Sequence, residues 1–278
     1  MSKPFLYYVP PSFFSQVARL ALAEKGIDYD SRYVIPGPPS FESYAPRYMQ
    51  LNPGGTVPTL VHEGKVIPDS LDVLRYLETR FELPALSQGR AERAEIDRLV
   101  ASLYAISFRE LSYGSPLLLK LGIRINRKRV RNLRERLSQH PHLAAIYEAK
   151  IRDIETFSGN AQDDAQMRRA RRVVADTLDQ FDAALRSRRF LAGEEYSLAD
   201  LVWTVGVARL TMISMKPLAK RPALERWYAQ MKSRPSFRDA GVMERFQPSA
   251  VLRVLWAKFR GSFFGAVQNR PHPLAAGE

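Results

Sequence analysis

Residues 51–70 read LNPGGTVPTLVHEGKVIPDS, and this stretch decides the fold of the first part of the chain. Residues 56–62 are rich in β-branched side chains and predict a strand, with Pro58 at its entry. A turn at Glu63-Gly64 separates this strand from a second one at residues 65–67. The stretch therefore predicts an antiparallel hairpin, followed by a helix that begins at its end.

The residues around this hairpin complete a small α+β unit. Residues 4–9 and 29–35 predict two further strands, and Pro10-Pro11 ends the first of them. A helix between them begins at Ser12 or Ser15 and ends at a glycine. Helical spacing returns at residues 70–80. The predicted order is βαβ followed by ββα, and a βαβ unit favours parallel pairing of its strands.

Beyond a linker at residues 81–89 the chain reads as helical throughout. The helical periodicity predicts segments at residues 90–112, 126–137, 141–157, 163–187, 198–213 and 222–233. Ser197 and Asp200 have the spacing of a capping box. We therefore expect a first domain at residues 1–82, an all-helical domain at 90–245 and a basic C-terminal extension at 246–278.

Composition limits the chemistry that is available. The chain has 278 residues and no cysteine, which excludes disulfides, thiolate metal sites and cysteine nucleophiles and fits a reducing compartment. Its four histidines have no metal-binding spacing, so we expect no metal. Neither a signal peptide nor an apolar run of membrane-spanning length is visible, and a cytoplasmic protein is expected.

The formal net charge of +13 is unevenly distributed. Residues 1–85 carry a net charge of −1 and the remainder carries +14. Opposite charges on the two parts would complement each other across a two-fold axis, so a homodimer is expected. No nucleic-acid recognition module is visible.

Three separated segments together resemble glutathione transferases: residues 8–16, residues 51–60 with 67–70, and residues 190–200. Within that superfamily the helical part resembles tetrachlorohydroquinone dehalogenases, at residues 134–136, 146–147, 197–204, 208–210, 227–232 and 236–237. The resemblance implies a thioredoxin-like domain that binds glutathione as co-substrate, followed by an all-α domain. The dehalogenases carry a cysteine two residues beyond the first serine of the N-terminal turn, where this chain has Phe14. Cysteine-dependent reductive dehalogenation is therefore not expected.

The resemblance also implies which residues hold glutathione. Ser12 matches the serine that donates a hydrogen bond to the glutathione thiolate, with Tyr8 and Ser15 as the alternatives. Val57 and Pro58 match a cis-proline turn whose backbone pairs with the cysteinyl unit. Asp69 and Ser70 match the pair that holds the γ-glutamyl group at a helix N-terminus, although a plain helix cap is the alternative.

An electrophile would lie between the N-terminal turn and the helical domain. The candidates for its apolar wall are aromatic residues, each of which could instead be core: Phe13, Phe14, Tyr104, Phe108 and Tyr113. Arg109 could face a phenolate or quinone oxygen, or simply be solvated.

Basic residues gather in two further regions. Seven arginines and lysines lie within residues 124–136, where we expect a solvated helical face. The C-terminal stretch 249–267 interleaves basic residues with Trp256 and several phenylalanines, a pattern that suits an anionic membrane surface, a dimer contact or packing on the protein itself.

Taken together, the resemblance and its candidate residues imply a transferase that attacks an apolar, aromatic or halogenated electrophile. The alternative is a non-catalytic or membrane-associated module on the same scaffold.

Overall fold

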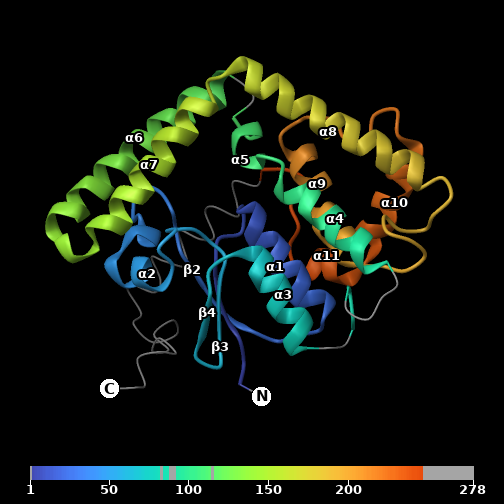
Figure 1. Cartoon of the computed structure of the whole chain (residues 1–278), viewed down its shortest axis with the longest axis horizontal. Coiled ribbons are helices and arrows are strands. Elements are labelled where there is room, and N and C mark those ends of the chain that lie inside the picture. The colour runs from blue at the N-terminus through green and yellow to red at the C-terminus, as the bar shows by residue number, and fades with distance from the viewer. Residues whose placement is uncertain (1, 82–83, 88–91, 114–115, 247–278) are drawn as a thin grey trace.

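The computed structural model describes residues 2–81, 84–87, 92–113 and 116–246 (Figure 1). The C-terminal stretch 249–267 lies outside these residues, so the three expectations about it stay open. None of the described helices combines the length and the apolar character needed to cross a bilayer.

Within the described residues, four strands form one mixed sheet in the order β2-β1-β3-β4. Strand β1 (Phe5–Tyr8) pairs in parallel with β2 (Asp30–Tyr33) and antiparallel with β3 (Thr59–His62). Strand β4 (Lys65–Ile67) completes the predicted hairpin with β3, and Gly64 at its turn has a φ of +74°. The predicted parallel βαβ unit and the antiparallel hairpin are both confirmed.

Helices pack on both faces of this sheet. Helices α1 (Phe13–Glu24) and α3 (Ser70–Arg80) cover the face to which Leu6 and Tyr8 point, and the N-cap of α3 is Asp69. Side chains alternate along a strand, so Tyr7 points to the opposite face, where it packs against Tyr48 of α2 (Pro46–Leu51). The fold is that of a thioredoxin-like domain.

The second part of the chain is entirely helical in its described residues. Helices α6 (Pro116–Gln139) and α7 (Ala144–Asn160) form a long antiparallel pair beside α2 (Figure 1). The other elements are α4 (Arg93–Tyr104), α5 (Phe108–Leu111), η2 (Pro141–Leu143), α8 (Asp164–Ala184), α9 (Leu198–Met212), α10 (Pro222–Ser233) and α11 (Pro235–Asp239). The expected domain limits at 82, 90 and 245 stay a prediction.

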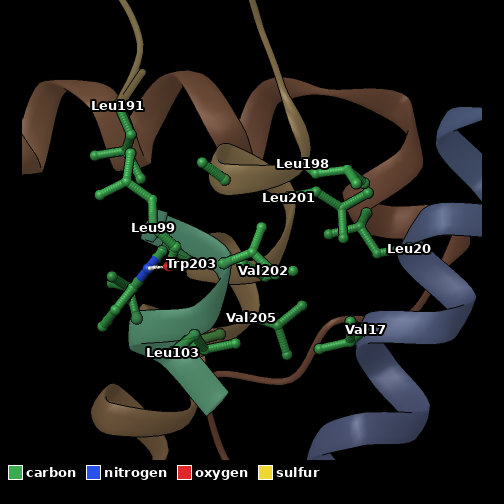
Figure 2. Packing of buried hydrophobic residues seen from close by; sticks show 14 of the residues in the cluster. Val17, Leu20, Leu99, Leu103, Leu191, Leu198, Leu201, Val202, Trp203 and Val205 are labelled. Carbon is green, nitrogen blue, oxygen red and sulfur yellow. Dashed lines mark hydrogen bonds between the residues drawn. The ribbon is translucent and has the colours of Figure 1, made fainter. Parts of the chain in front are cut away.

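Helix α9 is the centre of the largest apolar cluster. Its side chains Val202 and Val205 pack toward α1, while Trp203 packs against α4 and donates from Nε1 to the Leu99 carbonyl at 2.9 Å (Figure 2). A Cβ at Gly206 would lie 2.7 Å from the end of the Leu103 side chain, so a larger residue here would force Leu103 of α4 to shift. Helix α9 thus joins the helical part to the thioredoxin-like part.

The start of α9 is held by the predicted capping box. Ser197 and Asp200 form its two reciprocal hydrogen bonds. Asp200 is fully buried and also accepts from Leu191 N at 2.9 Å and Trp227 Nε1 at 2.8 Å. The Asp200 carboxylate also accepts from the backbone N–H and the hydroxyl of Ser197, and all four donors are neutral. Burial raises the pKa of Asp200, while these hydrogen bonds oppose the rise.

Two helix predictions were wrong in detail, and other helices were missed. The predicted helix 90–112 is broken into α4 and α5 by a turn at residues 105–107. Helix α6 is longer than the predicted 126–137. The short η1 (Glu42–Tyr44) was missed because residues 36–46 are rich in proline and serine, which favour loops, and α2, which begins at the end of that stretch, was missed with it.

Candidate functional site

The loop before β3 contains Val57, which is 9% exposed. The Val57–Pro58 bond is cis, as the sequence predicted. The Tyr48 hydroxyl and the Asn52 amide donate to the Thr56 carbonyl at 2.6 and 3.0 Å, which fixes the residue before Val57. Among the described residues the Val57 N–H has no hydrogen-bond partner. An extended peptide could therefore pair with Val57 like an added strand.

Ser12 lies at the same place, at the N-cap of α1. Its Oγ accepts from Ser15 N at 3.3 Å and donates to the Val57 carbonyl at 3.4 Å. Both distances are at the weak end of the range for hydrogen bonds, so the hydroxyl can turn toward a new acceptor. The first N–H groups of α1 and the positive end of its dipole favour a negative charge here. The position suits a thiolate sulfur.

The two alternatives to Ser12 are both buried. Tyr8 lies in the core under α1, with its ring 4.9 Å from the Arg19 guanidinium and 5.1 Å from the ring of Tyr33. Burial raises the pKa of Tyr8, and Arg19 opposes the rise. Ser15 is fully buried, and its Oγ has no hydrogen-bond partner among the described residues. Of the three candidates, Ser12 is the one whose hydroxyl contacts Val57.

Asp69 and Ser70 lie at the N-terminus of α3. Asp69 Oδ1 caps the helix by accepting from Leu71 N at 2.7 Å and Asp72 N at 3.4 Å. The side chain is exposed, and its second oxygen can still accept from an ammonium group. Ser70 is buried, and its hydroxyl lies 3.0 Å from the Tyr104 hydroxyl. Asp69 is thus the N-cap of α3, and its second carboxylate oxygen is still able to bind a ligand.

Four of the five predicted wall residues form one aromatic cluster. Phe13 stacks on Phe108 with ring centroids 4.3 Å apart, and Phe14 stacks on Tyr104 at 5.4 Å. Phe13 and Phe14 meet edge to face at 4.9 Å. Tyr104 therefore connects this cluster to Ser70, and burial raises the pKa of its phenol while the Ser70 hydrogen bond opposes the rise.

Tyr113 and Arg109 lie apart from that cluster. Tyr113 packs against Gly122 of α6 and lies 5.2 Å from the ring of Phe157 of α7. Arg109 covers the same Phe157 ring at 3.8 Å and pairs with Asp153, with Nη1 to Oδ1 at 3.1 Å. Grooves of about 950 Å³ between α6 and α7 and about 690 Å³ beside α5 and α8 lie elsewhere on the molecule.

Sequence reasoning missed the role of Arg209. This arginine of α9 donates from Nη2 to the Pro11 carbonyl at 2.6 Å, and its guanidinium lies 5.7 Å from the Phe13 ring centroid. Burial lowers the pKa of Arg209 to about 10. A helix of the second part thus holds the turn that carries Ser12. Only contact across 198 residues reveals this, so no local pattern could have shown it.

Comparison with known proteins gives a consistent result. The model "Glutathione S-transferase, N-terminal domain" matches residues 11–80, and "Glutathione S-transferase, C-terminal domain" matches residues 139–235. The chain is 30% identical to tetrachloro-p-hydroquinone reductive dehalogenase of Sphingobium chlorophenolicum, over 89% of this chain and 99% of that protein. It is also 30% identical to glutathione S-transferase TCHQD of Arabidopsis thaliana, over 84% of this chain and 87% of the relative.

A solved structure agrees with these matches. The crystal structure of a glutathione S-transferase from Rhodospirillum rubrum F11 superposes with a TM-score of 0.61 at 28% identity. The superposition covers 88% of this chain and 94% of that one.

Proposed function

This chain belongs to the glutathione S-transferase family, and we propose on that premise that it joins glutathione to a small apolar electrophile, aromatic or halogenated. Glutathione is the co-substrate of this family. One observation carries the proposal: the Ser12 hydroxyl, the N-terminus of α1 and the unpaired Val57 N–H meet at one place in the described structure.

The proposed chemistry is attack by a thiolate. Glutathione's thiol resembles a free cysteine, of pKa about 8.5, and its proton leaves to solvent before attack. A hydrogen bond from Ser12 and the dipole of α1 stabilise the resulting sulfur anion. In substitution the sulfur forms a bond to the electrophilic carbon, and the halide leaves with the electron pair of the broken bond. In an addition reaction the sulfur also forms a bond to the electrophilic carbon, no group leaves, and a proton from solvent completes the product.

We further propose that the reaction stops at the thioether. Reduction of a glutathionyl-aromatic intermediate by the protein would require a thiolate to attack its sulfur. The chain contains no cysteine, and the ring of Phe14 stacks on Tyr104 at the position where the dehalogenases resembled here carry one. The relative named a reductive dehalogenase thus shares the scaffold, while this chain would use it for conjugation.

The setting of this activity is also a proposal. We propose a cytoplasmic homodimer with a role in detoxification, supported by the opposite charges of residues 1–85 and the remainder. Light scattering tests the dimer: a particle of 31.7 kDa at low salt would contradict it.

Calorimetric titration with glutathione tests the binding part of the proposal. We expect binding in the millimolar range or tighter, and absence of binding at millimolar glutathione would refute it. Single-turnover mass spectrometry tests the chemistry. With one equivalent of glutathione and tetrachlorohydroquinone, a glutathione thioether is the expected product. Stoichiometric formation of the reduced arene by the wild type would refute the proposal.

The C-terminal stretch 249–267 supports a second candidate, a membrane-associated module on the same scaffold. Its basic residues and aromatic side chains suit an anionic lipid surface.

Co-sedimentation with anionic liposomes tests this membrane association: the full-length protein should pellet and a chain truncated to residues 1–245 should not. Equal pelleting of both would remove this candidate.

A further inference from the structure

Two cations pair with one carboxylate where α5 and α7 meet, and a third cation, from α6, lies close to them. Arg109 of α5, Arg129 of α6 and Lys150 of α7 make up this basic cluster, together with Asp153 of α7. Asp153 accepts from Lys150 Nζ at 2.8 Å and from Arg109 Nη1 at 3.1 Å. Arg129 has no carboxylate within ion-pair distance in the described structure; its Nη1 donates to the Asn126 amide oxygen at 3.2 Å. The cluster therefore carries two positive charges in excess.

One donor in this cluster is left without an acceptor. Arg129 Nε is buried and has no hydrogen-bond partner among the residues that the structure describes. Tyr44, a residue that is only 2% exposed, lies close to Arg129 and Arg109, and its backbone carbonyl accepts from the Tyr147 hydroxyl. A buried donor without an acceptor costs free energy, and an anion that accepts from it would recover it.

The electrostatics point the same way. Burial lowers the pKa of Lys150, Asp153 opposes this, and the charges of Arg109 and Arg129 lower it further. Burial also raises the pKa of Tyr44, while Arg129 and Arg109 oppose the rise, so the phenol keeps its proton and can donate it. A buried cation that lacks a full counter-charge is unfavourable, and a bound anion would stabilise it.

The cluster adjoins the residues proposed to bind glutathione and its electrophile. Arg109 directly follows Phe108, which stacks on Phe13 next to Ser12. On the other side, a Cβ at Gly55 would lie 3.2 Å from the ring of Tyr44, and Gly55 is two residues before Val57. The cluster is therefore connected along the chain to the Phe13–Phe108 stack and to the Val57 turn, and a ligand that contacted both would place its ring beside α5 and its anionic group among the cations.

We propose that the basic cluster binds the anionic group of an aromatic co-substrate, a carboxylate or a phenolate. This inference rests on the proposed function, because it names the class of electrophile. Arginine presents a planar fork of donors that suits carboxylates, and charge-assisted hydrogen bonds are the stronger ones. The cluster thus selects electrophiles that pair an apolar ring with a negative charge.

A matched pair of electrophiles tests the proposal. Both 4-chloro-3-nitrobenzoate and 4-chloro-3-nitrobenzamide lose chloride to a thiolate, but only the first carries a charge. The wild type should favour the benzoate in kcat/KM relative to the uncatalysed rates. Arg129→Met should lower this preference about tenfold, the size of one charge-assisted hydrogen bond. Arg131→Met, which changes an exposed arginine of the same helix, should keep the wild-type preference.

Further arms separate the alternatives. Lys150→Met preserves the buried stem and should also lower the preference, which covers the case that the Arg129 variant does not fold. Competitive inhibition by benzoate against 2,4-dinitrophenolate tells which anionic group is bound. A wild type without preference overturns the proposal. So does an equal loss of glutathione affinity in Arg129→Met, because the cluster would then hold a carboxylate of glutathione itself.

The failure of the proposed function has a separate signature. If neither electrophile yields a conjugate, the transferase proposal fails. Calorimetric titration of the benzoate and the benzamide without glutathione still tests the cluster. Tighter binding of the benzoate that is lost in Arg129→Met supports the site, and equal binding of the two overturns it.

Discussion

Two polar regions of this molecule differ in how completely their polar groups are hydrogen-bonded. At the start of α9 the Asp200 carboxylate is fully buried and accepts four hydrogen bonds from neutral donors. Around Val57 and the basic cluster, in the described structure, the Val57 backbone N–H and Arg129 Nε lack acceptors. The difference separates polar groups that hold the fold from polar groups arranged for a ligand.

The largest effect is expected where the hydrogen bonds are saturated. Asp200→Ala leaves the Leu191 and Ser197 amides and the Trp227 indole buried without acceptors. The free energy of unfolding should fall by about 3–5 kcal/mol in urea denaturation. Asp163→Ala is the matched control, since it removes the exposed N-cap of α8 and should cost about 1 kcal/mol. Equal losses would show that burial does not distinguish the two caps.

Substitutions around Val57, where the polar groups are not fully hydrogen-bonded, should lower activity more than stability. Ser12→Ala removes the hydroxyl beside Val57 and should lower kcat/KM for conjugation about 10- to 100-fold. The thiol pKa of bound glutathione, followed by thiolate absorbance, should rise in this variant. Tyr8→Phe and Ser15→Ala test the alternatives. A larger loss in either of them would move the activating role away from Ser12.

A second saturated carboxylate tests whether charged donors behave like neutral ones. Glu24 of α1 accepts from Arg234 Nε at 2.8 Å and Nη2 at 2.6 Å, and also from the Ser236 hydroxyl. Burial opposes its ionisation, but Arg234 and Ser236 together hold the pKa of Glu24 below its ordinary value. The stabilisation is therefore present above about pH 4.3, the unfolded value, and is lost as the pH falls through the folded pKa.

Glu24→Gln makes this dependence measurable. At pH 7 the variant should be about 1–2 kcal/mol less stable than the wild type, the range for a hydrogen bond to a charged group. The difference should shrink as the pH falls below 4.3, the unfolded value for glutamate, because the wild type loses its own charge. Urea midpoints across this pH range provide the test, and a difference that grows at low pH would contradict it.

The smallest effect is expected at the hydrogen bond between Tyr104 of α4 and Ser70 of α3. Tyr104→Phe removes the hydroxyl that lies 3.0 Å from Ser70 Oγ but keeps the stack on Phe14. Ser70 would be less well oriented, and the dissociation constant for glutathione should rise about threefold to tenfold. Titration calorimetry measures this. Unchanged affinity would mean that Ser70 is positioned by α3 alone.

The sequence predicted the sheet better than the site because its signals are local. The turn at Gly64 follows from a short pattern, the cis bond before Pro58 was expected from the resemblance to the family's cis-proline turn, and the structure has both. The side-chain alternation along β1 also contains the reason why Tyr8 faces α1. Nothing local indicates that Tyr104 meets Ser70 or that Arg209 reaches Pro11, because those contacts depend on how helices pack across the chain.

The helix boundaries show the same limit. Helices α2 and α11 were not predicted, although each has a proline in its first turn, where proline suits a helix. The break between α4 and α5 occurs at residues 105–107, inside an apolar helical pattern. Packing against neighbouring elements decides such positions, and periodicity alone does not.

The hydrogen bond from Arg209 to Pro11 has a consequence for modularity. The turn that presents Ser12 accepts a hydrogen bond from an arginine in the second part of the chain, so the thioredoxin-like part alone lacks one of the contacts that hold this turn. A chimera that grafts residues 1–81 onto the helices of another relative would contain the serine without this hydrogen bond. Recombination within such a family would therefore have to exchange α1 and α9 together, as a pair inherited across the domain border.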